Sequence, residues 1–294
     1  MKILLTLLLI PVLAALTCCG CGRIAGNIGY HYDNAGQYHT GTATIDQPVD
    51  SFDIEWIAGS VSIGYHARND IIIEETSRTE LTDETFVHWR LENTTLYIRF
   101  AASGVHSREL DGLQKSLTVM LPEGFRAGEL EAELVSASFE AAGLAAEELD
   151  IESVSGPIEI TQTGYTRKLK LESVSGRISA AAEQVGEMEI STVSGNVDAR
   201  IADIRTLELN SVSGNMELSL AAVPAVCTAD TTSGSVLLRL PAGASFTAVL
   251  DTVSGGFTSG FAVTQNGGTY ISGSGEARFT FDTVSGSVHI MELS

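Results

Sequence analysis

The chain has 294 residues, of which 17 are basic and 37 acidic, so its formal net charge at pH 7 is −20. A surface this acidic repels phosphate groups, which argues against nucleic acid and anionic lipid headgroups as direct partners. With 29 glycines but only 6 prolines and 44% hydrophobic residues, the composition is typical of a folded, repetitive β protein and unlike that of a disordered chain.

Residues 1–21 are predicted to be a targeting segment of the lipoprotein type. Lys2 supplies a short positive start, and the apolar run that follows is too short for a comfortable transmembrane helix. The run LTCCGC resembles a bacterial lipobox, in which the chain is cut before a cysteine that receives lipid. Cys19 is the preferred lipidation site and Cys21 the alternative, while a plain secretory signal is the competing interpretation. In either case we expect an exported chain, with the lipid holding it on a membrane surface.

Residues 22–41 show no period and are predicted to form a tether. Between residues 42 and 129 the runs SFDIEW, SVSIGY, DIIIEE, TFVHWR, TLYIRF and SLTVML alternate apolar and polar residues, which is typical of strands joined by short turns. Residues 101–115 are the expected loop or short helix. Residues 57–61, IAGSV, look like a divergent copy of the corner described next, so this part is expected to cap or begin the same stack.

From residue 130 onward a unit of about twenty residues recurs, for example as LDIESVSGPIEI, LKLESVSGRISA and MEISTVSGNVDA. Measured at its glycine, with Ala137 replacing it in a weaker first copy, the steps are 19, 20, 19, 19, 20, 21 and 31. Glycine-rich residues 264–276 explain the last step as an excursion before the final strand pair. Self-similarity at this period predicts stacked units. The corner residues are Ser155, Gly156, Ser175, Gly176, Ser194, Gly195, Ser213, Gly214, Ser233, Gly234, Ser254, Gly255, Ser285 and Gly286.

The alternation of apolar residues in each unit changes phase by one residue at Val-Ser-Gly, as it would where two half-buried strands meet at a corner. Glycine permits positive φ and close backbone approach there, and the serine can bond the local backbone or its counterpart one coil away. Such short strands bury their apolar sides only by stacking. The sequence therefore predicts an all-β fold, a parallel β-solenoid of coils of about 20 residues with an N-terminal β cap. An antiparallel sandwich is the alternative, although its hairpins would favour Asn-Gly or Asp-Gly turns.

No clear linker interrupts residues 42–294. They are expected to form one elongated domain, in which residues 42–129 make the cap and first coils and residues 130–294 make the repeats.

Candidate chemistry is sparse. Cys227 occupies an apolar column of the repeat and is predicted to be a buried hydrophobe, so no disulfide framework is expected. The six histidines show no metal-ligand spacing, and His289 is expected to face outward. We therefore predict no catalytic residue, no cofactor and no transition-metal site.

An acidic column is the sharpest candidate site. One residue of each repeat precedes the Ser or Thr before Val-Ser-Gly, and in a parallel stack these residues would lie about 5 Å apart on one outer face. Carboxylate oxygens suit a hard cation, so this column is a candidate Ca²⁺ site, with a solvated acidic face as the simpler interpretation. The candidate ligands are Glu133, Glu152, Glu172, Asp230, Asp251 and Asp282, in two trios that flank the neutral Ser191 and Asn210.

A basic cluster and an aromatic cluster are two further candidate sites. Arg167, Lys168 and Lys170, with Arg177 near, form the one basic cluster of the repeats, and a solvated turn explains it better than a polysaccharide lyase site would. Aromatic residues concentrate in the N-terminal strands, where core packing accounts for most of them and a carbohydrate- or peptide-binding surface is the alternative.

The run IEWIAGSVSI, then LTVMLPEGF, then the successive SVSG or TVSG corners resemble the bacterial "putative adhesin" family, a domain of unknown function with β-strand repeats. The likeness covers about residues 45–290 and implies a β-solenoid with a role at the cell envelope. The family offers no catalytic residues to carry over to this sequence.

Three functions follow as hypotheses. The first is a non-catalytic, adhesin-like binding or structural module, lipid-anchored outside the cytoplasmic membrane, with an envelope protein or a glycan as partner. The second is a regulatory envelope-stress protein that acts through a membrane partner. The third is a carbohydrate-active enzyme, which regular repeats argue against because catalysis demands local departures from a scaffold.

Overall fold

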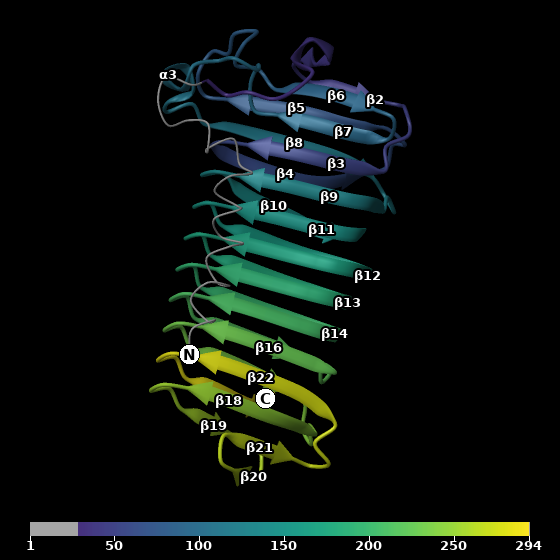
Figure 1. The fold of residues 1–294 in the computed structure, drawn as a ribbon. Helices are drawn as coiled ribbons and strands as arrows, with labels where there is room; N and C mark the ends of the chain where they lie inside the picture. Colours follow the sequence, from purple (N-terminus) through teal and green to yellow (C-terminus); the bar gives the residue numbers. More distant parts are fainter. Residues whose placement is uncertain (1–28, 294) are drawn as a thin grey trace. The chain divides into compact units, whose positions relative to one another are not determined.

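The structure is a computed structural model that describes residues 29–293, and these residues form two compact units (Figure 1). The N-terminal unit comprises residues 29–160 and the C-terminal unit residues 161–293. The expected targeting segment, including Cys19 and Cys21, lies outside the described residues. No helix in the part of the chain that the structure describes is long and apolar enough to span a membrane.

The N-terminal unit has two layers of strands. One layer has the order β1 (His39–Thr40), β6 (His88–Glu92), β7 (Thr95–Arg99), β3 (Ser51–Trp56), β9 (Ala127–Leu134), β11 (Ala146–Ser153). The other has the order β2 (Ala43–Ile45), β5 (Ile71–Ser77), β8 (Lys115–Pro122), β4 (Gly59–His66), β10 (Ser138–Leu144). Pairing is parallel among the coils and antiparallel only where β1, β6, β2 and β5 cap them.

The predicted cap is thus confirmed, and its first coil is inserted between two later ones. Strand β3 lies between β7 and β9, and β4 lies between β8 and β10, so the chain order is not the spatial order. The expected loop at residues 101–115 contains the single turn α3 (Ser107–Leu110).

The tether prediction is wrong for residues 29–41. This segment contains the 3-10 turn η2 (Ala35–Gln37) and strand β1, and it packs on the N-terminal unit. The Tyr30 side chain is only 4% exposed, its N–H donates to the Val105 carbonyl at 2.9 Å and its hydroxyl donates to Glu55 at 3.3 Å. Three tyrosines within nine residues supplied apolar area that the aperiodic pattern did not reveal.

In the C-terminal unit, the middle coils turn sharply at only one place. Strands β13 (Ile178–Thr192) and β14 (Val197–Ser211) each run from one Val-Ser-Gly corner to the next, so the second turn of each coil is a bend within a continuous strand. These two strands pair in parallel from Ile178–Val197 to Thr192–Ser211. Strand β12 (Ile158–Ser173) has the same form, and the division between the units falls within it.

The remaining strands are β15 (Met216–Leu220), β16 (Val226–Thr231), β17 (Val236–Leu240), β18 (Phe246–Thr252), β19 (Phe257–Ser259), β20 (Val263–Asn266), β21 (Thr269–Ser272), β22 (Ala277–Thr283) and β23 (Val288–Glu292). The last coil of the chain, β22 and β23, is inserted between its two predecessors. Strand β22 pairs with β16 on one side and β18 on the other, and β23 pairs with β17 and β19. The order of the final repeats along the chain is therefore not their order in the stack. The glycine-rich excursion is a hairpin, β20–β21, laid antiparallel along β18.

The corner glycines are required by close stacking and not by positive φ. A Cβ built on Gly195 would lie 2.1 Å from the Gly176 carbonyl oxygen, and one on Gly214 would lie 2.0 Å from that of Gly195. None of the corner glycines from Gly156 to Gly286 has a positive φ. Of the two reasons that the sequence offered for glycine, only close approach applies.

The corner serines bond their neighbours one coil away, as predicted. The Ser213 hydroxyl donates to the Val193 carbonyl at 3.1 Å, and the other corner serines with described contacts repeat this bond. The same bonds follow the insertion of the last coil. Ser285 of that coil donates to Thr232, and Ser254 donates to Val284 of that coil.

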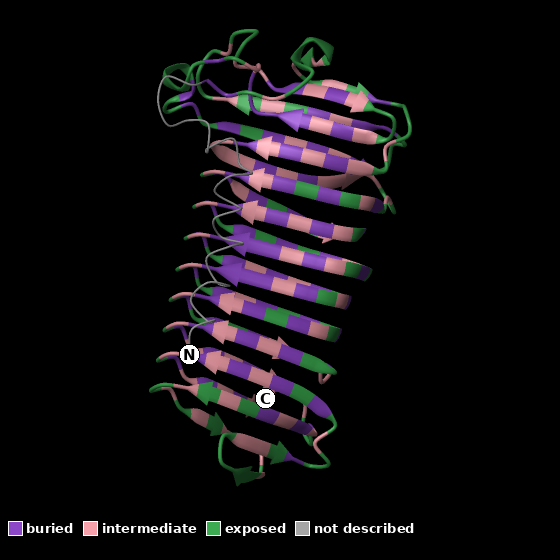
Figure 2. Cartoon of the chain, viewed as in Figure 1, coloured by how far each residue is buried: buried purple, intermediate pink, exposed green. Residues whose placement is uncertain are grey.

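Alternation of buried and exposed residues along every coil places one side of each strand in the interior (Figure 2). In the C-terminal unit the column Leu207–Cys227–Phe279–Ala248 stacks in register, and each of these side chains is fully buried. The predicted all-β parallel solenoid with an N-terminal β cap is confirmed.

Candidate functional site

The acidic column exists in the N-terminal unit and is longer than the sequence indicated. Register places Glu55, Glu133 and Glu152 side by side on β3, β9 and β11. A second column two residues earlier holds Asp53, Glu131 and Asp150. Carboxylates therefore stand next to one another in both directions across the outer face of these strands.

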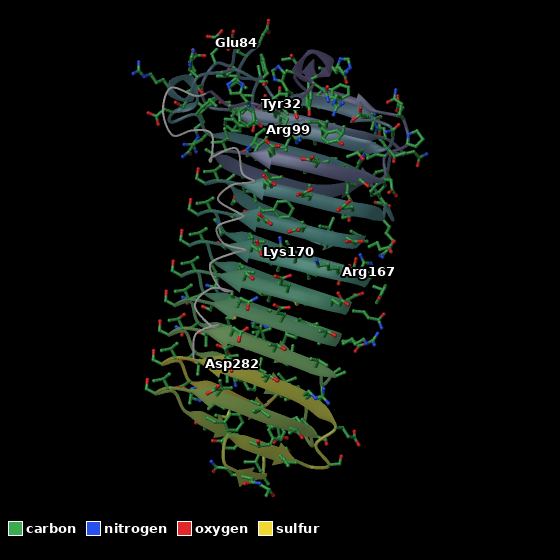
Figure 3. All side chains as sticks on the ribbon, in the orientation of Figure 1. Tyr32, Glu84, Arg99, Arg167, Lys170 and Asp282 are labelled. Atoms are coloured by element: carbon green, nitrogen blue, oxygen red, sulfur yellow. The ribbon has the colours of Figure 1, made fainter. Side chains whose placement is uncertain are left out.

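Arg99 on the neighbouring strand β7 pairs with the first acid of each column. Its guanidinium lies 2.7 Å from Asp53 Oδ1 and 3.2 Å from Glu55 Oε1, and the side chain is almost buried (Figure 3). The guanidinium compensates the two carboxylates nearest to it.

Crowding of these acids changes their protonation. Burial raises the pKa of Glu133 to about 8, and the neighbouring charges of Glu55, Glu131 and Glu152 act in the same direction. Burial and the charges of Asp53 and Asp150 raise the pKa of Glu131 to about 6. At neutral pH this face therefore carries less negative charge than its composition implies.

In the C-terminal unit the column has the order Ser191, Asn210, Asp230, Asp282, Asp251. The expected trio of aspartates is present, but insertion of the last coil puts Asp282 in its centre. Burial and the charge of Asp282 raise the pKa of Asp230 to about 6. Glu172 is almost buried and pairs with Lys170 at 3.4 Å.

No three His, Cys, Asp or Glu side chains among residues 29–293 are placed so that they could hold a metal ion together. The carboxylates stand in rows along the outer face and do not surround a common point. A solvated acidic face remains the simpler interpretation of this column, and the Ca²⁺ site stays a hypothesis.

The structure separates the four residues of the basic cluster. Arg167 lies within β12, at the side of the sheet away from the corners (Figure 3), while Lys170 pairs with Glu172 on the acidic face. Arg177 follows the corner and lies 3.7 Å from Asp198 of the next coil. These residues do not share one basic patch.

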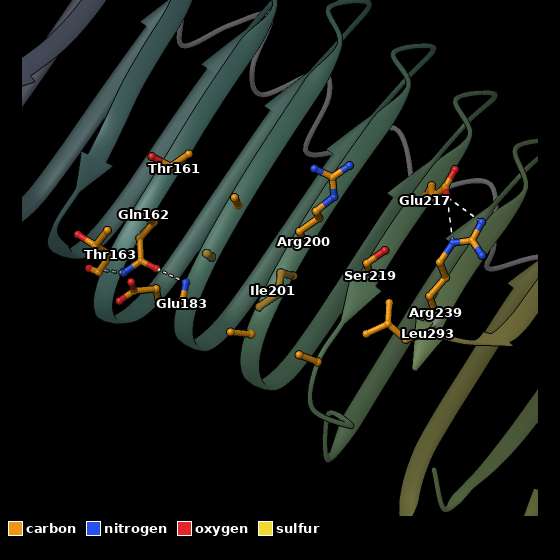
Figure 4. A pocket seen from close by; sticks show the side chains of 14 residues that line it. Thr161, Gln162, Thr163, Glu183, Arg200, Ile201, Glu217, Ser219, Arg239 and Leu293 are labelled. Atoms are coloured by element: carbon orange, nitrogen blue, oxygen red, sulfur yellow. Dashed lines mark hydrogen bonds and ion pairs between the residues drawn. The ribbon is translucent and has the colours of Figure 1, made fainter. Parts of the chain in front are cut away.

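A groove crosses the opposite layer of the C-terminal unit, on the outer side of the strands that follow the corners (Figure 4). It encloses about 740 Å³, and its floor is made of small residues such as Ala181, Ala202 and Ser219. Polar side chains of Thr161, Gln162 and Thr163 line one end. An open, shallow trough of this kind fits an extended ligand better than a compact one.

Two arginines stand in this groove on alternate coils. Register places Ala181, Arg200, Ser219 and Arg239 in one column across β13, β14, β15 and β17. Two strand spacings separate the arginine backbones by about 10 Å. Glu217 holds Arg239 with bonds of 3.0 and 3.1 Å (Figure 4), whereas Arg200 makes no ion pair with any described residue.

Gln162 is fixed at the end of the groove. Its amide nitrogen donates to the Thr163 and Gly164 carbonyls at 2.8 and 3.0 Å, and its oxygen accepts the Glu183 N–H at 3.2 Å. Its side chain is therefore a support for the backbone bend, and the groove end is rigid.

The sequence contained the signal for this groove. Arg200, Ser219 and Arg239 each follow a corner glycine by five residues, as Ala181 does. The predicted acidic column, in contrast, consists of residues that precede the corner. The aligned column after the corner would have shown two arginines on one outer face.

A buried ion pair in the N-terminal unit also escaped the sequence analysis. Lys115 is 1% exposed, its Nζ lies 2.6 Å from Glu75 Oε1, and it donates to the carbonyls of Thr85 (2.6 Å) and Phe100. The ammonium also faces the Phe100 ring at 4.2 Å. Burial lowers the pKa of Lys115 to about 8, against the opposing effect of Glu75. This buried lysine thus links β8 to Glu75 of β5 and to the segments that contain Thr85 and Phe100.

Cys227 and the aromatic residues lie largely where the sequence placed them. Burial raises the pKa of the Cys227 thiol to about 12, which suppresses the reactive thiolate. Trp56 and Phe100 pack in the core with their ring centroids 5.0 Å apart. Tyr97 lies on the outer side, where Arg90 covers its ring at 4.6 Å. His289 points outward from β23 and is half-buried.

The family model for the Toastrack domain DUF4097 matches residues 49–291. The chain belongs to this family. The resemblance to the "putative adhesin" repeats, which rested on the Val-Ser-Gly corners, is thereby confirmed. Among curated proteins, none matches this Toastrack chain.

Several solved structures are similar to this Toastrack chain. A "putative lipid binding protein" from Parabacteroides distasonis is 15% identical, with 88% of this chain and 98% of that one covered and a TM-score of 0.47. A "putative adhesin" from Parabacteroides merdae is also 15% identical, with coverages of 88% and 97% and a TM-score of 0.45. A "putative cell adhesion protein" from Clostridium sporogenes is 9% identical, with coverages of 87% and 100% and a TM-score of 0.33.

Proposed function

We propose that this Toastrack protein is a non-catalytic binding module of the cell envelope, and that the groove of the C-terminal unit binds an acidic glycan chain. The observation that carries the proposal is the column Ala181–Arg200–Ser219–Arg239 in a long, open trough, where Arg200 has no ion pair with a described residue and Glu217 holds the guanidinium of Arg239.

The chemistry of the groove supports an anionic polymer. Arginine recognises carboxylates and sulfates through its planar fork of donors. Arginines whose backbones are about 10 Å apart suit a chain that carries acidic groups at a regular interval, as a polysaccharide with one uronic acid per disaccharide does. Thr161, Thr163 and Ser219 add hydroxyl groups that can exchange hydrogen bonds with sugar hydroxyls.

The ligand must overcome the net charge of the protein. At −20 the protein repels a polyanion at long range, so binding depends on the local arginines and not on steering. We therefore expect association to be slow and the affinity to be modest. The association rate and the affinity should both rise as added salt screens the long-range repulsion.

Export and lipid anchoring on Cys19, or alternatively Cys21, form part of the proposal. Metabolic labelling with a fatty acid tests it, with Cys19→Ala and Cys21→Ala compared with the wild type. We expect Cys19→Ala to lose the label and to release the protein from the membrane fraction. A wild-type protein that takes up no label would overturn lipid anchoring without touching the groove.

Binding to immobilised polysaccharides tests the groove itself. We expect the protein to bind a uronic-acid polymer and not its carboxyl-reduced form, and Arg200→Ala to weaken binding about tenfold. Arg205→Ala is the matched control, because Arg205 is an exposed arginine of the same strand β14 outside the groove. Equal binding by wild type and Arg200→Ala would refute the groove. Recovery of a membrane protein instead of a glycan would favour the regulatory alternative.

A further inference from the structure

The C-terminal unit ends in an open strand edge. Strand β20 pairs with β21 through Val263–Ser272, Thr264–Ile271, Gln265–Tyr270 and Asn266–Thr269, and β21 pairs in turn with β18. No other described strand pairs with β20, so the backbone donors and acceptors along its outer edge are open to a further strand.

This end of the unit carries no charge. No Asp, Glu, Lys or Arg occurs between Asp251 and Glu276 in a chain of net charge −20. Proteins usually protect an exposed edge with lysine, proline, inward charges or a bulge, because an unprotected edge is a template for another strand. Strand β20 and its flanking residues have none of these devices.

Apolar side chains accompany the open edge. Val249 on β18 is 40% exposed and Ile271 on β21 is 38% exposed, while Val253 is 73% exposed at the adjoining corner. Thr264 pairs with Ile271, which in turn pairs with Thr247, so these side chains share one face of the terminal strands. A strand added to β20 would extend this face on the side away from Asp251, where residues 252–275 supply no charged side chain.

The core beneath the hairpin is already closed. The rings of Phe257 and Tyr270 stack with centroids 4.0 Å apart, and Phe246 contacts Phe261 at 5.7 Å. The open edge is therefore not an unfinished core that waits for more of this chain. It is a finished hairpin with an unpaired outer strand.

We propose that two copies of this protein associate through their β20 strands, which pair antiparallel about a two-fold axis. A second copy fits this edge because repulsion between two chains of charge −20 is weakest where both lack charge. A β20–β20 pair is also self-complementary, as a two-fold interface requires, and it leaves no new edge at the junction. This interface is separate from the groove and does not depend on the proposed function.

Sedimentation analysis over a range of concentrations tests the interface, with the mature chain carrying Cys19→Ser and Cys21→Ser so that lipid does not interfere. We expect a reversible dimer. Thr264→Lys places two like charges at the paired edges and should weaken the dimer at least tenfold. Thr44→Lys is the matched control, because Thr44 is an exposed threonine on the short edge strand β2 of the N-terminal unit.

A mixing experiment separates loss of the interface from loss of the fold. Thr264→Lys and Thr264→Glu should each be largely monomeric, and an equimolar mixture should recover a heterodimer. A wild-type chain that stays monomeric throughout, a dimer that Thr264→Lys leaves intact, or a dimer broken by Thr44→Lys would each overturn the proposal. A monomer that binds an added β-strand peptide at β20 would show a different occupant and would also overturn it.

Discussion

The two units share a repeat but end it in opposite ways. The N-terminal unit closes with antiparallel strands of two or three residues, β1 and β2, and Asp46, Pro48 and Asp50 follow directly in the chain. It also contains the buried Lys115–Glu75 pair. The C-terminal unit closes with an uncharged hairpin whose outer strand is open. Each unit must end its coils somewhere, and the N-terminal unit has features that prevent strand addition at its end while the C-terminal unit lacks them.

The largest effect should come from removing the ion pair that distinguishes the N-terminal cap. Lys115→Met leaves the buried Glu75 carboxylate without its cation, so we expect a loss of about 3–5 kcal/mol in the free energy of unfolding. Urea denaturation followed by tryptophan fluorescence measures it, since Trp56 lies beside the ammonium. The double variant Lys115→Met, Glu75→Gln should recover part of the loss. An unchanged midpoint for the single variant would contradict this account of the cap.

The next effect concerns the stacked corners that distinguish the C-terminal unit. Gly214→Ala pushes a methyl group against the Gly195 carbonyl, where a Cβ would lie at 2.0 Å, and should cost about 1–3 kcal/mol. Gly256→Ala is the control, because a Cβ on Gly256 has no atom within 4 Å. Thermal unfolding of both variants measures the difference. Equal melting temperatures would show that the corners tolerate a side chain.

A smaller effect comes from the acidic columns of the N-terminal unit. The folded-state pKa of Glu133, about 8, lies above its unfolded value, so the folded state holds the proton more tightly. The free energy of unfolding therefore falls as pH rises from about 4.5 towards 8, and the full penalty applies above that range. Glu133→Gln should remove about 1 kcal/mol of it at pH 8.5 and change little at pH 4. Glu140→Gln, on an exposed position of β10, should show no such pH dependence.

The smallest expected effect is that of Ca²⁺. Because each coil contributes one carboxylate to a column, a cation would meet too few ligands, and we expect no binding heat in a titration up to millimolar Ca²⁺. A saturable heat that Asp282→Asn abolishes would instead establish a site in the aspartate trio of the C-terminal unit. A heat lost in Glu133→Gln would place the site in the N-terminal unit.

The sequence predicted the coil and its corner because both are local. Alternation around Val-Ser-Gly defined the interior side, and the period defined the columns of Cys227 and of the acids. The sequence could not predict the spatial order of the coils at the ends of the two units. The alternation of apolar residues in β3 and β22 would be the same at any position in the stack. Ala137 is an example. It occupies the corner position of the weaker first copy, but β10, the strand that follows it, pairs with β4 of the cap. Lys115 gave no signal, since its partner Glu75 lies in a different strand.

Insertion of the last coil has a consequence for biosynthesis. Until residues 277–292 have been synthesised, β16 and β17 have no neighbour on the side where β22 and β23 will pair. A chain shortened at its carboxyl terminus by the length of this coil would thus lose a piece from the interior of the stack and not from its tip. Without this coil, β16, β17, β18 and β19 would each lose a paired neighbour, so local opening and sensitivity to proteases should rise.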